Sequence, residues 1–409
     1  MKGDPPVPGP TVCSEKPYRF VPPRNSRFWP WFFGLWLKRY LRKSHGIHSW
    51  EVAGSERLRE SLRAGHGILL VPNHPRPSDP MSLGLITRAV RSRLYVLASA
   101  HLFLQSRFHS WLLPRVGGFS VYREGMDRES LKAAIDILAN ARRPLAVFAE
   151  GVITRTNDRL IELQDGVAFM ARTAAKQRKE AVPGGRVVVH PLALRYTFKG
   201  DIGRTLSPVL EKIERRLSWQ PQRNLGLVER VEKLGAAILA LKEIEHFGEA
   251  RSGPMSERLA ALLDRMLQPM EREWIKGTIV ASPVRRVKNL RKAIVPGLVA
   301  GKVSAEEWER RWKQIYDLEV AGQIFHFPPG YLGAAPSPER LMETVERMEE
   351  AVDPANITVN GPLHLRIEIG EAIPVETGGD KRALSAGLMD RVRASLVGML
   401  GIADEGNPQ

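Results

Sequence analysis

The fold of this chain is decided by the stretch Gly67-Ile68-Leu69-Leu70-Val71-Pro72-Asn73-His74-Pro75-Arg76-Pro77-Ser78-Asp79. Its first five residues form an uninterrupted apolar run, which predicts a short buried strand. The prolines at positions 72, 75, 77 and 80 forbid a regular helix before Met81, so we expect the polar residues in a stiff loop at the carboxyl end of that strand. Open α/β sheets bind their ligands at this edge.

A histidine and an aspartate lie five positions apart in this loop. An imidazole has an unperturbed pKa of about 6.5 and takes up a proton near neutrality, while a carboxylate on its other nitrogen fixes the tautomer. We therefore interpret His74 as a candidate catalytic base and Asp79 as the acid that orients it. The alternative is a structural turn, in which the aspartate closes the loop through an Asx-type hydrogen bond.

Apolar runs continue to alternate with helical patterns after this loop. Further strands are expected at 94–98, 145–148 and 187–194, and helices at 81–90, 128–141 and 164–179. This alternation predicts an α/β fold with a mostly parallel sheet flanked by helices on both faces.

Strand signals then almost vanish between residues 201 and 356. Helical patterns follow one another there, at 225–244, 256–274, 304–318 and 338–352, before a period-two strand at 363–369 and a last helix at 381–400. The chain is therefore predicted to be one α/β domain with a large helical insertion before the last strand. The expected segments are an extended, partly disordered N-terminus (1–26), an aromatic and basic segment (27–49), the α/β core (50–204), the insertion (205–356), and the closing strand and helix (357–402).

Composition restricts the classes of partner. The 409 residues carry 61 Lys and Arg against 45 Asp and Glu, a formal charge of +16, so an anionic surface or substrate is expected. Nucleic acid is not expected, because no helix-turn-helix, zinc-finger or RNP signature occurs. The single cysteine, Cys13, excludes an intramolecular disulfide and points to a reducing compartment.

An aromatic segment near the N-terminus suggests contact with lipid. No run reaches the roughly 18 to 20 apolar residues of a membrane-spanning helix. Residues 28–37, however, hold three tryptophans and three phenylalanines, and Lys38, Arg39, Arg42 and Lys43 follow. This pattern favours an interfacial anchor on an anionic membrane, with a buried N-terminal helix as the alternative. No cleaved signal peptide is expected, because the first 27 residues are polar and proline-rich.

Three more polar motifs lie at or just after strand ends. They are Gly117-Gly118-Phe119-Ser120-Val121-Tyr122-Arg123, Phe148-Ala149-Glu150-Gly151-Val152-Ile153-Thr154-Arg155, and His190-Pro191-Leu192-Ala193-Leu194-Arg195-Tyr196. Each also has a simple structural interpretation: Arg123 could form a surface ion pair, Glu150-Gly151 could be a turn, and Arg195-Tyr196 could be the end of a strand. Together with the first motif, the series Asn-His-x4-Asp, Gly-x-Phe-x-x-x-Arg, Phe-x-Glu-Gly and Pro-Leu-Ala-Leu-Arg-Tyr resembles the four blocks of the glycerolipid acyltransferase family. These are the PlsC-type glycerol-3-phosphate and 1-acylglycerol-3-phosphate (lysophosphatidic acid) acyltransferases.

The resemblance covers about residues 50–200, and the strand that ends in 370–374 resembles the closing strand of the family's fold. It implies that His74 deprotonates an acceptor hydroxyl, which attacks an acyl thioester directly without a covalent acyl-enzyme, and that Asp79 orients His74. It also implies that Arg123 binds the acceptor phosphate, while Glu150 and Gly151 position the glycerol hydroxyls. The further substrate-binding candidates are Asn73, Arg155 and Arg195.

The implied reaction is phospholipid biosynthesis or remodelling at the cytoplasmic face of a membrane. The acceptor would be a lysophospholipid or glycerol phosphate, and the donor acyl-CoA or acyl carrier protein (acyl-ACP). No bound cofactor is implied, and no histidine, cysteine and carboxylate cluster has the spacing of metal ligands.

The third motif departs from the family pattern, which usually reads Phe-Pro-Glu-Gly-Thr followed by Arg and Ser. Here Ala149 replaces the proline, Val152 replaces the threonine, and Arg155 comes two places late. The alternative function is therefore a non-catalytic, membrane-associated protein that keeps the acyltransferase-like fold and uses the insertion for partner contacts. A further apolar segment, 101–113, is expected to be helical and to line an acyl groove, enter a membrane or pack in the core.

Overall fold

The computed structural model describes residues 18–217, 219–277, 282–299, 303–325, 330–333 and 335–403. Cys13 and most of the expected extended N-terminus lie outside these residues. The chain folds as two compact units: Tyr18–Thr197 with Pro362–Pro408 form one, and Phe198–Gly361 belongs to the other. We call the first the α/β unit and the second the helical unit. The predicted α/β fold with a mostly parallel sheet is confirmed.

The sheet of the α/β unit has eight strands in the order β1-β7-β6-β2-β5-β3-β4, with β8 paired to β6. The strands are β1 (Ile47–Ala53), β2 (Gly67–Pro72), β3 (Tyr95–Ser99), β4 (Gly118–Val121), β5 (Leu145–Ala146), β6 (Val187–Phe198), β7 (Leu363–Ile369) and β8 (Ile373–Pro374). The pair of β8 with β6 is antiparallel, whereas β2 pairs in parallel with both β5 and β6. The strands that return after the helical unit therefore complete the same sheet.

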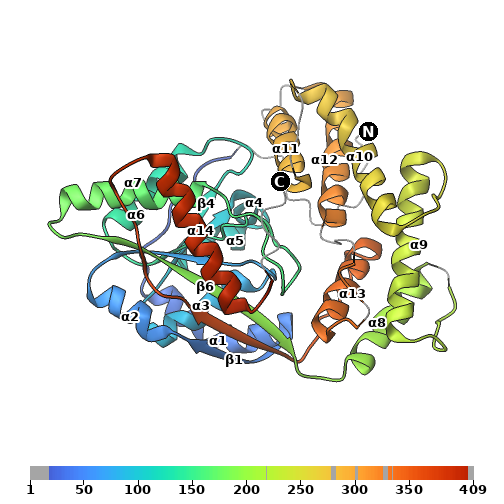
Figure 1. Ribbon diagram of the computed structural model, residues 1–409, viewed down its shortest axis with the longest axis horizontal. Helices are drawn as coiled ribbons and strands as arrows, with labels where there is room; N and C mark the ends of the chain where they lie inside the picture. Colours follow the sequence, from blue (N-terminus) through green and yellow to red (C-terminus); the bar gives the residue numbers. More distant parts are fainter. Residues whose placement is uncertain are drawn as a thin grey trace. The chain divides into compact units, whose positions relative to one another are not determined.

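Helices cover both faces of this sheet (Figure 1). One layer consists of α1 (Phe28–His45), α2 (Ser55–Arg63) and α3 (Asp79–Val90), and the other of α6 (Arg128–Ala139), α7 (Gly166–Ala181) and α14 (Lys381–Leu400). The short helices α4 (Ala100–Leu104) and α5 (Arg107–Arg115) pack near β3 and β4. Every residue of β2 is buried, as expected for a central strand covered on both sides.

Two local expectations were wrong. Helix α3 begins at Asp79 and not after Pro80. Proline is tolerated in the first helical turn, because the N–H groups of that turn have no hydrogen-bond partner within the helix and the missing N–H of Pro80 costs nothing there. The expected helix over 101–113 is broken into α4 and α5, and Phe103 is buried while Phe108 is exposed.

The described part of the helical unit consists of the helices α8 (Ile202–Arg216), α9 (Leu227–Phe247), α10 (Met255–Trp274), α11 (Pro283–Val299), α12 (Ala305–Phe325) and α13 (Pro338–Val352). An apolar core lies among α9, α10, α11 and α12. Arg230 and Glu214 form a buried ion pair between α9 and α8, with two hydrogen bonds of 3.0 and 2.8 Å. Within the described residues of the whole chain, no helix is both long and apolar enough to cross a membrane.

Gly67 sets how closely α6 packs on the strand that leads to His74. A Cβ at this position would lie 2.1 Å from the backbone oxygen of Leu138, which cannot move aside as a side chain could. We expect Gly67→Ala to lower the free energy of unfolding by about 2 to 4 kcal/mol. Thermal unfolding measures this loss. Gly166→Ala, where a Cβ meets nothing within 4 Å, is the control, and equal melting temperatures of the two variants would contradict the packing argument.

Candidate active site

The neighbouring strands β2 and β5 bring two of the sequence motifs together. Because the two strands run in parallel, the residues that follow them emerge at the same edge of the sheet. The ring of His74 stacks on that of Phe148, with 4.1 Å between ring centroids and 29° between planes. One face of the imidazole is thus covered by an aromatic ring, which fixes its orientation.

The pair predicted from the sequence is in contact. Nδ1 of His74 lies 2.8 Å from Oδ2 of Asp79, whose side chain is fully buried. A carboxylate only accepts hydrogen bonds, so this contact requires the proton on Nδ1 and leaves the lone pair on Nε2. The His74 side chain is 13% exposed, and no residue in the described part of the chain hydrogen-bonds Nε2. This geometry suits a general base.

A residue that was not predicted as a site residue from the sequence completes this pair. The hydroxyl of Tyr196, on β6, donates a 2.5 Å hydrogen bond to Oδ1 of Asp79 and also contacts the hydroxyl of Ser78 at 3.1 Å. Burial raises the pKa of Tyr196 well above its usual value, and the charge of Asp79 adds to this shift, so the phenol stays a neutral donor. A signal was available, because a tyrosine within a fully buried strand needs a partner for its hydroxyl.

Asn73 continues the pairing of β2 with β6 beyond the end of β2. Its side-chain amide donates to the carbonyl oxygen of Leu194 and its side-chain oxygen accepts from the N–H of the same residue, at 3.1 and 2.7 Å. The side chain therefore replaces a backbone pair after Pro72 ends β2. The structure gives Asn73 this anchoring role, and a substrate contact of Asn73 stays a prediction.

Glu150 holds the backbone of the candidate base. One carboxyl oxygen accepts from the N–H of His74 at 2.7 Å and the other from that of Ile161 at 3.1 Å. On the other side, the N–H of Thr154 donates to the carbonyl oxygen of His74 at 2.9 Å. Glu150 is almost completely buried, and this burial raises the pKa of its carboxyl to about 8. Its carboxyl group thus holds the backbone of His74, whereas the resemblance implied that it positions the glycerol hydroxyls of the substrate.

The C-terminal helix reinforces this arrangement. Arg393 on α14 donates to the carbonyl oxygens of Ile161 and Leu160, at 3.1 and 3.4 Å. The loop that binds Glu150 is therefore fixed by a residue far outside the four motifs.

The three predicted arginines occupy different surroundings. A Cβ built on Gly151, which has a φ of +70°, would lie 3.8 Å from Nη2 of Arg123, so this guanidinium reaches the third motif. Arg155 has a left-handed backbone with a φ of +55°, an unusual conformation for a side-chain-bearing residue. Arg195 caps α14 through the carbonyl oxygen of Leu400 at 3.1 Å. It points to the opposite face of β6 from Tyr196, so the structure does not bring Arg195 to the His74 side of the strand.

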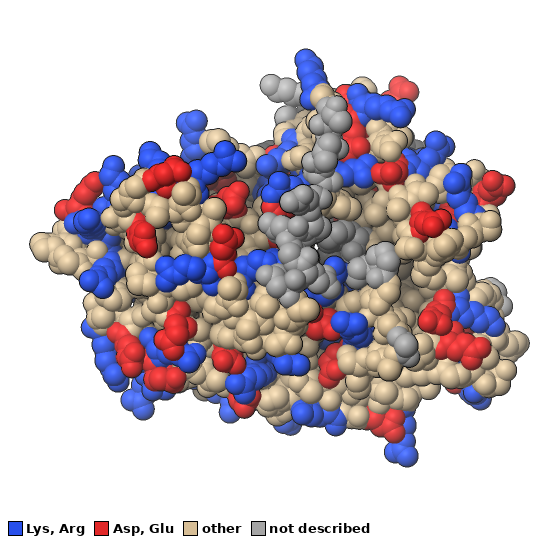
Figure 2. All heavy atoms as spheres, viewed as in Figure 1, with Lys and Arg blue, Asp and Glu red and all other residues tan. Residues whose placement is uncertain are grey.

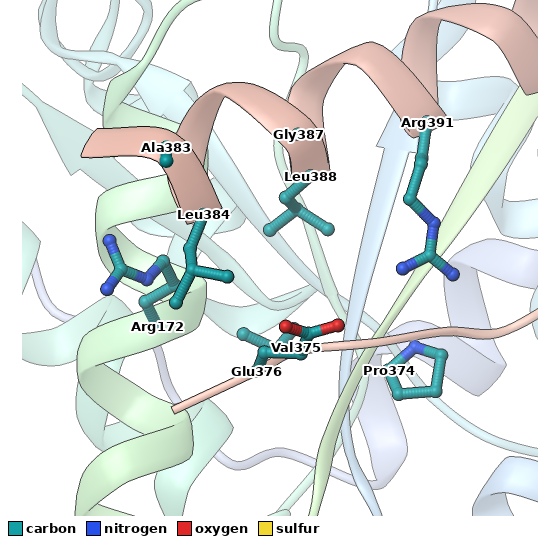
Figure 3. Close-up of a pocket in the computed structure, with 9 residues that line it drawn as sticks. All are labelled: Arg172, Pro374, Val375, Glu376, Ala383, Leu384, Gly387, Leu388 and Arg391. Carbon is teal, nitrogen blue, oxygen red and sulfur yellow. The ribbon is translucent and has the colours of Figure 1, made fainter. Parts of the chain in front are cut away.

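A pocket lies elsewhere in the α/β unit, between α7, α14 and the segment around β8. Figure 3 shows Leu384 and Leu388 pointing from α14 toward Val375 and Glu376, with Arg391 beside them. None of its lining residues belongs to the four motifs. Among the described residues, no group of histidine, cysteine and carboxylate side chains could hold a metal ion.

Comparison with known proteins agrees with this geometry. Residues 50–195 match the family model described as Acyltransferase, and all four motifs lie within or end beside this range. No similar protein was found among curated sequences. This match supports membership of the glycerolipid acyltransferase family for residues 50–195, and acyl transfer in the general sense as the activity.

The pKa of Glu150 has a testable consequence for stability. The folded carboxyl keeps its proton up to its pKa of about 8, whereas the carboxyl in the unfolded chain releases its proton above the usual pKa of 4.5. Folding therefore takes up a proton between these values, and raising the pH lowers the free energy of unfolding by about 1.4 kcal/mol per pH unit. Glu150→Gln, which cannot ionise, should lack this decline. Parallel pH profiles of unfolding for the two proteins would contradict the assignment.

Proposed function

We propose that this protein transfers a fatty acyl group from an acyl thioester to a hydroxyl of a lysophospholipid or of glycerol phosphate. The observation that supports it most is the contact of His74 with buried Asp79, which leaves Nε2 available beside the third motif. The donor would be the thioester of coenzyme A or of acyl carrier protein, since both present the same reacting group.

In this proposal the reaction is a direct transfer. Nε2 of His74 takes the proton of the acceptor hydroxyl while the hydroxyl oxygen attacks the thioester carbonyl. The tetrahedral intermediate then expels the thiolate, which takes the proton back from the imidazolium. Asp79 stabilises the imidazolium between these steps. Because the acceptor hydroxyl attacks the thioester itself, no acyl group is ever bound covalently to the protein.

A phosphate group on the acceptor would let binding energy assist catalysis. The planar guanidinium of Arg123, next to Gly151, suits a phosphate oxygen pair. Holding the phosphate there aligns the hydroxyl with His74 and makes the encounter effectively unimolecular. A substrate contact for Arg155 belongs to the same proposal, whereas Asn73, Glu150 and Arg195 have the structural partners described above.

The test is acyl transfer by the purified protein, measured with palmitoyl and oleoyl thioesters and a panel of acceptors. We expect His74→Ala to lower kcat by about a thousandfold with little loss of stability, because the general base is removed. His364→Ala is the matched control, since His364 lies on β7 outside the four motifs and its ring is hydrogen-bonded to Ser49 at 2.8 Å.

Two outcomes would contradict the proposal. Equal turnover by the wild type and His74→Ala would show that His74 is not the base. If no thioester is consumed with any acceptor, the protein would instead be the non-catalytic, membrane-associated alternative.

A further inference from the structure

The turn that carries Arg123 is closed by one carboxylate. It runs from Tyr122 to Asp127, between β4 and α6. Oδ2 of Asp127 accepts a hydrogen bond of 2.9 Å from the backbone N–H of Tyr122. Oδ1 accepts one of 2.9 Å from the N–H of Ser130, in the first turn of α6. A single side chain thus joins the start of the turn to the helix that follows it.

The segment before α1 reaches the same carboxylate. The hydroxyl of Tyr18 donates a 2.5 Å hydrogen bond to Oδ2 of Asp127 and lies 3.0 Å from the hydroxyl of Ser120 on β4. The ring of Tyr18 stacks on that of Tyr122, with 5.3 Å between centroids and 18° between planes. Burial first, and then the hydrogen bond to Asp127, raise the pKa of Tyr18, so its hydroxyl stays a donor at neutral pH. Tyr18 therefore contacts both ends of the turn.

Backbone hydrogen bonds anchor the segment of Tyr18 along β4, the last strand in the sheet order. The N–H of Val21 donates to the hydroxyl oxygen of Ser120 at 2.8 Å, and the N–H of Ser120 donates to the carbonyl oxygen of Val21 at 3.1 Å. Further on, the N–H of Arg24 donates to the carbonyl oxygen of Pro114 at 3.0 Å. Tyr18 is thus held by contacts that do not involve the turn itself.

The position of this turn decides where the guanidinium of Arg123 lies. Nη2 of Arg123 reaches the third motif, 3.8 Å from a Cβ built on Gly151. A guanidinium grips a phosphate through two parallel hydrogen bonds in a fixed fork. Such a contact requires the group to be held within about 0.5 Å of its binding position. The contacts that fix the turn therefore affect affinity for a phosphate.

The net charge of the protein does not replace such positioning. Figure 2 shows Lys and Arg interspersed with Asp and Glu on the face in view, so the formal charge of +16 is not gathered into one cationic field there. Salt also screens exposed charges beyond about 10 Å. A phosphate is then held by guanidinium groups that contact its oxygens directly.

We propose that Tyr18 is a positioning residue: acting through Asp127, it fixes the turn of Arg123 and sets the affinity of the site for an acceptor phosphate. The inference rests on the role given to Arg123 in the proposed function. It assigns control of this affinity to a segment that lies outside the four motifs and outside the matched residues 50–195. Without the Tyr18 hydroxyl, Asp127 keeps the donors of Tyr122 and Ser130, so the turn loosens without unfolding.

Binding without turnover tests the proposal. The full chain is titrated calorimetrically, with no thioester present, with glycerol 3-phosphate and with lysophosphatidic acid below its micellar concentration. We expect Tyr18→Phe to raise the Kd of the phosphate acceptor about tenfold, while the melting temperature falls by no more than about 4 °C. Tyr316→Phe is the matched control, because it removes a tyrosine hydroxyl from α12 of the helical unit, and its Kd should equal that of the wild type.

A double-mutant cycle separates positioning from a general loss of structure. In the Arg123→Ala background, Tyr18→Phe should cause no further loss of affinity, because no guanidinium is left to position. Three results would overturn the proposal: no binding of either phosphate compound by the wild type, equal Kd values for the wild type and Tyr18→Phe, or the same loss with and without Arg123.

The two proposals can fail separately. Thioester turnover together with equal Kd values for the wild type and Tyr18→Phe would overturn this inference and leave acyl transfer standing. Phosphate binding that depends on both Tyr18 and Arg123, with no thioester consumed, would support this inference and contradict acyl transfer.

Discussion

The site depends on burying one carboxylate, that of Asp79. A charge removed from water costs several kcal/mol unless donors satisfy it, and Asp79 is fully buried. Three donors meet this demand: the imidazole of His74, the backbone N–H of Arg76 and the hydroxyl of Tyr196. They come from the loop after β2 and from β6, so these two strands must pair before all three donors reach the carboxylate. The proton position on His74 follows from the same constraint.

The backbone of His74 is fixed as firmly as its ring. Glu150 binds its N–H and Thr154 binds its carbonyl oxygen, while Arg393 fixes the loop that supports Glu150. The residues after the helical unit therefore contribute to the site as well as to the sheet. The segment that returns to the α/β unit is therefore needed at the site, since α14 supplies Arg393.

Much of the fold followed from periodicity, and the misses have identifiable causes. The clean patterns of α13, β7 and α14 gave the same bounds in sequence and structure, because amphipathic helices and alternating strands repeat every 3.6 and 2 residues. The strand β1 was missed because its half-exposed residues mix polar and apolar types without alternation. At the site, the pairing of His74 with Asp79 was predictable from local spacing. The partners of Tyr196, Glu150 and Arg195 were not predictable, because each depends on which face of a distant strand or loop meets the side chain, although the need of a buried tyrosine for some partner was.

The central claim is that Asp79 holds the proton of His74 on Nδ1 and leaves Nε2 free to act as the base. Nitrogen-15 NMR of the imidazole, at a pH where the ring is neutral, measures this directly through the shifts of the two ring nitrogens. We expect a protonated Nδ1 and an unprotonated Nε2 in the wild type, and a mixture of tautomers in Asp79→Asn. A wild-type ring protonated on Nε2, or already a mixture, would contradict the account.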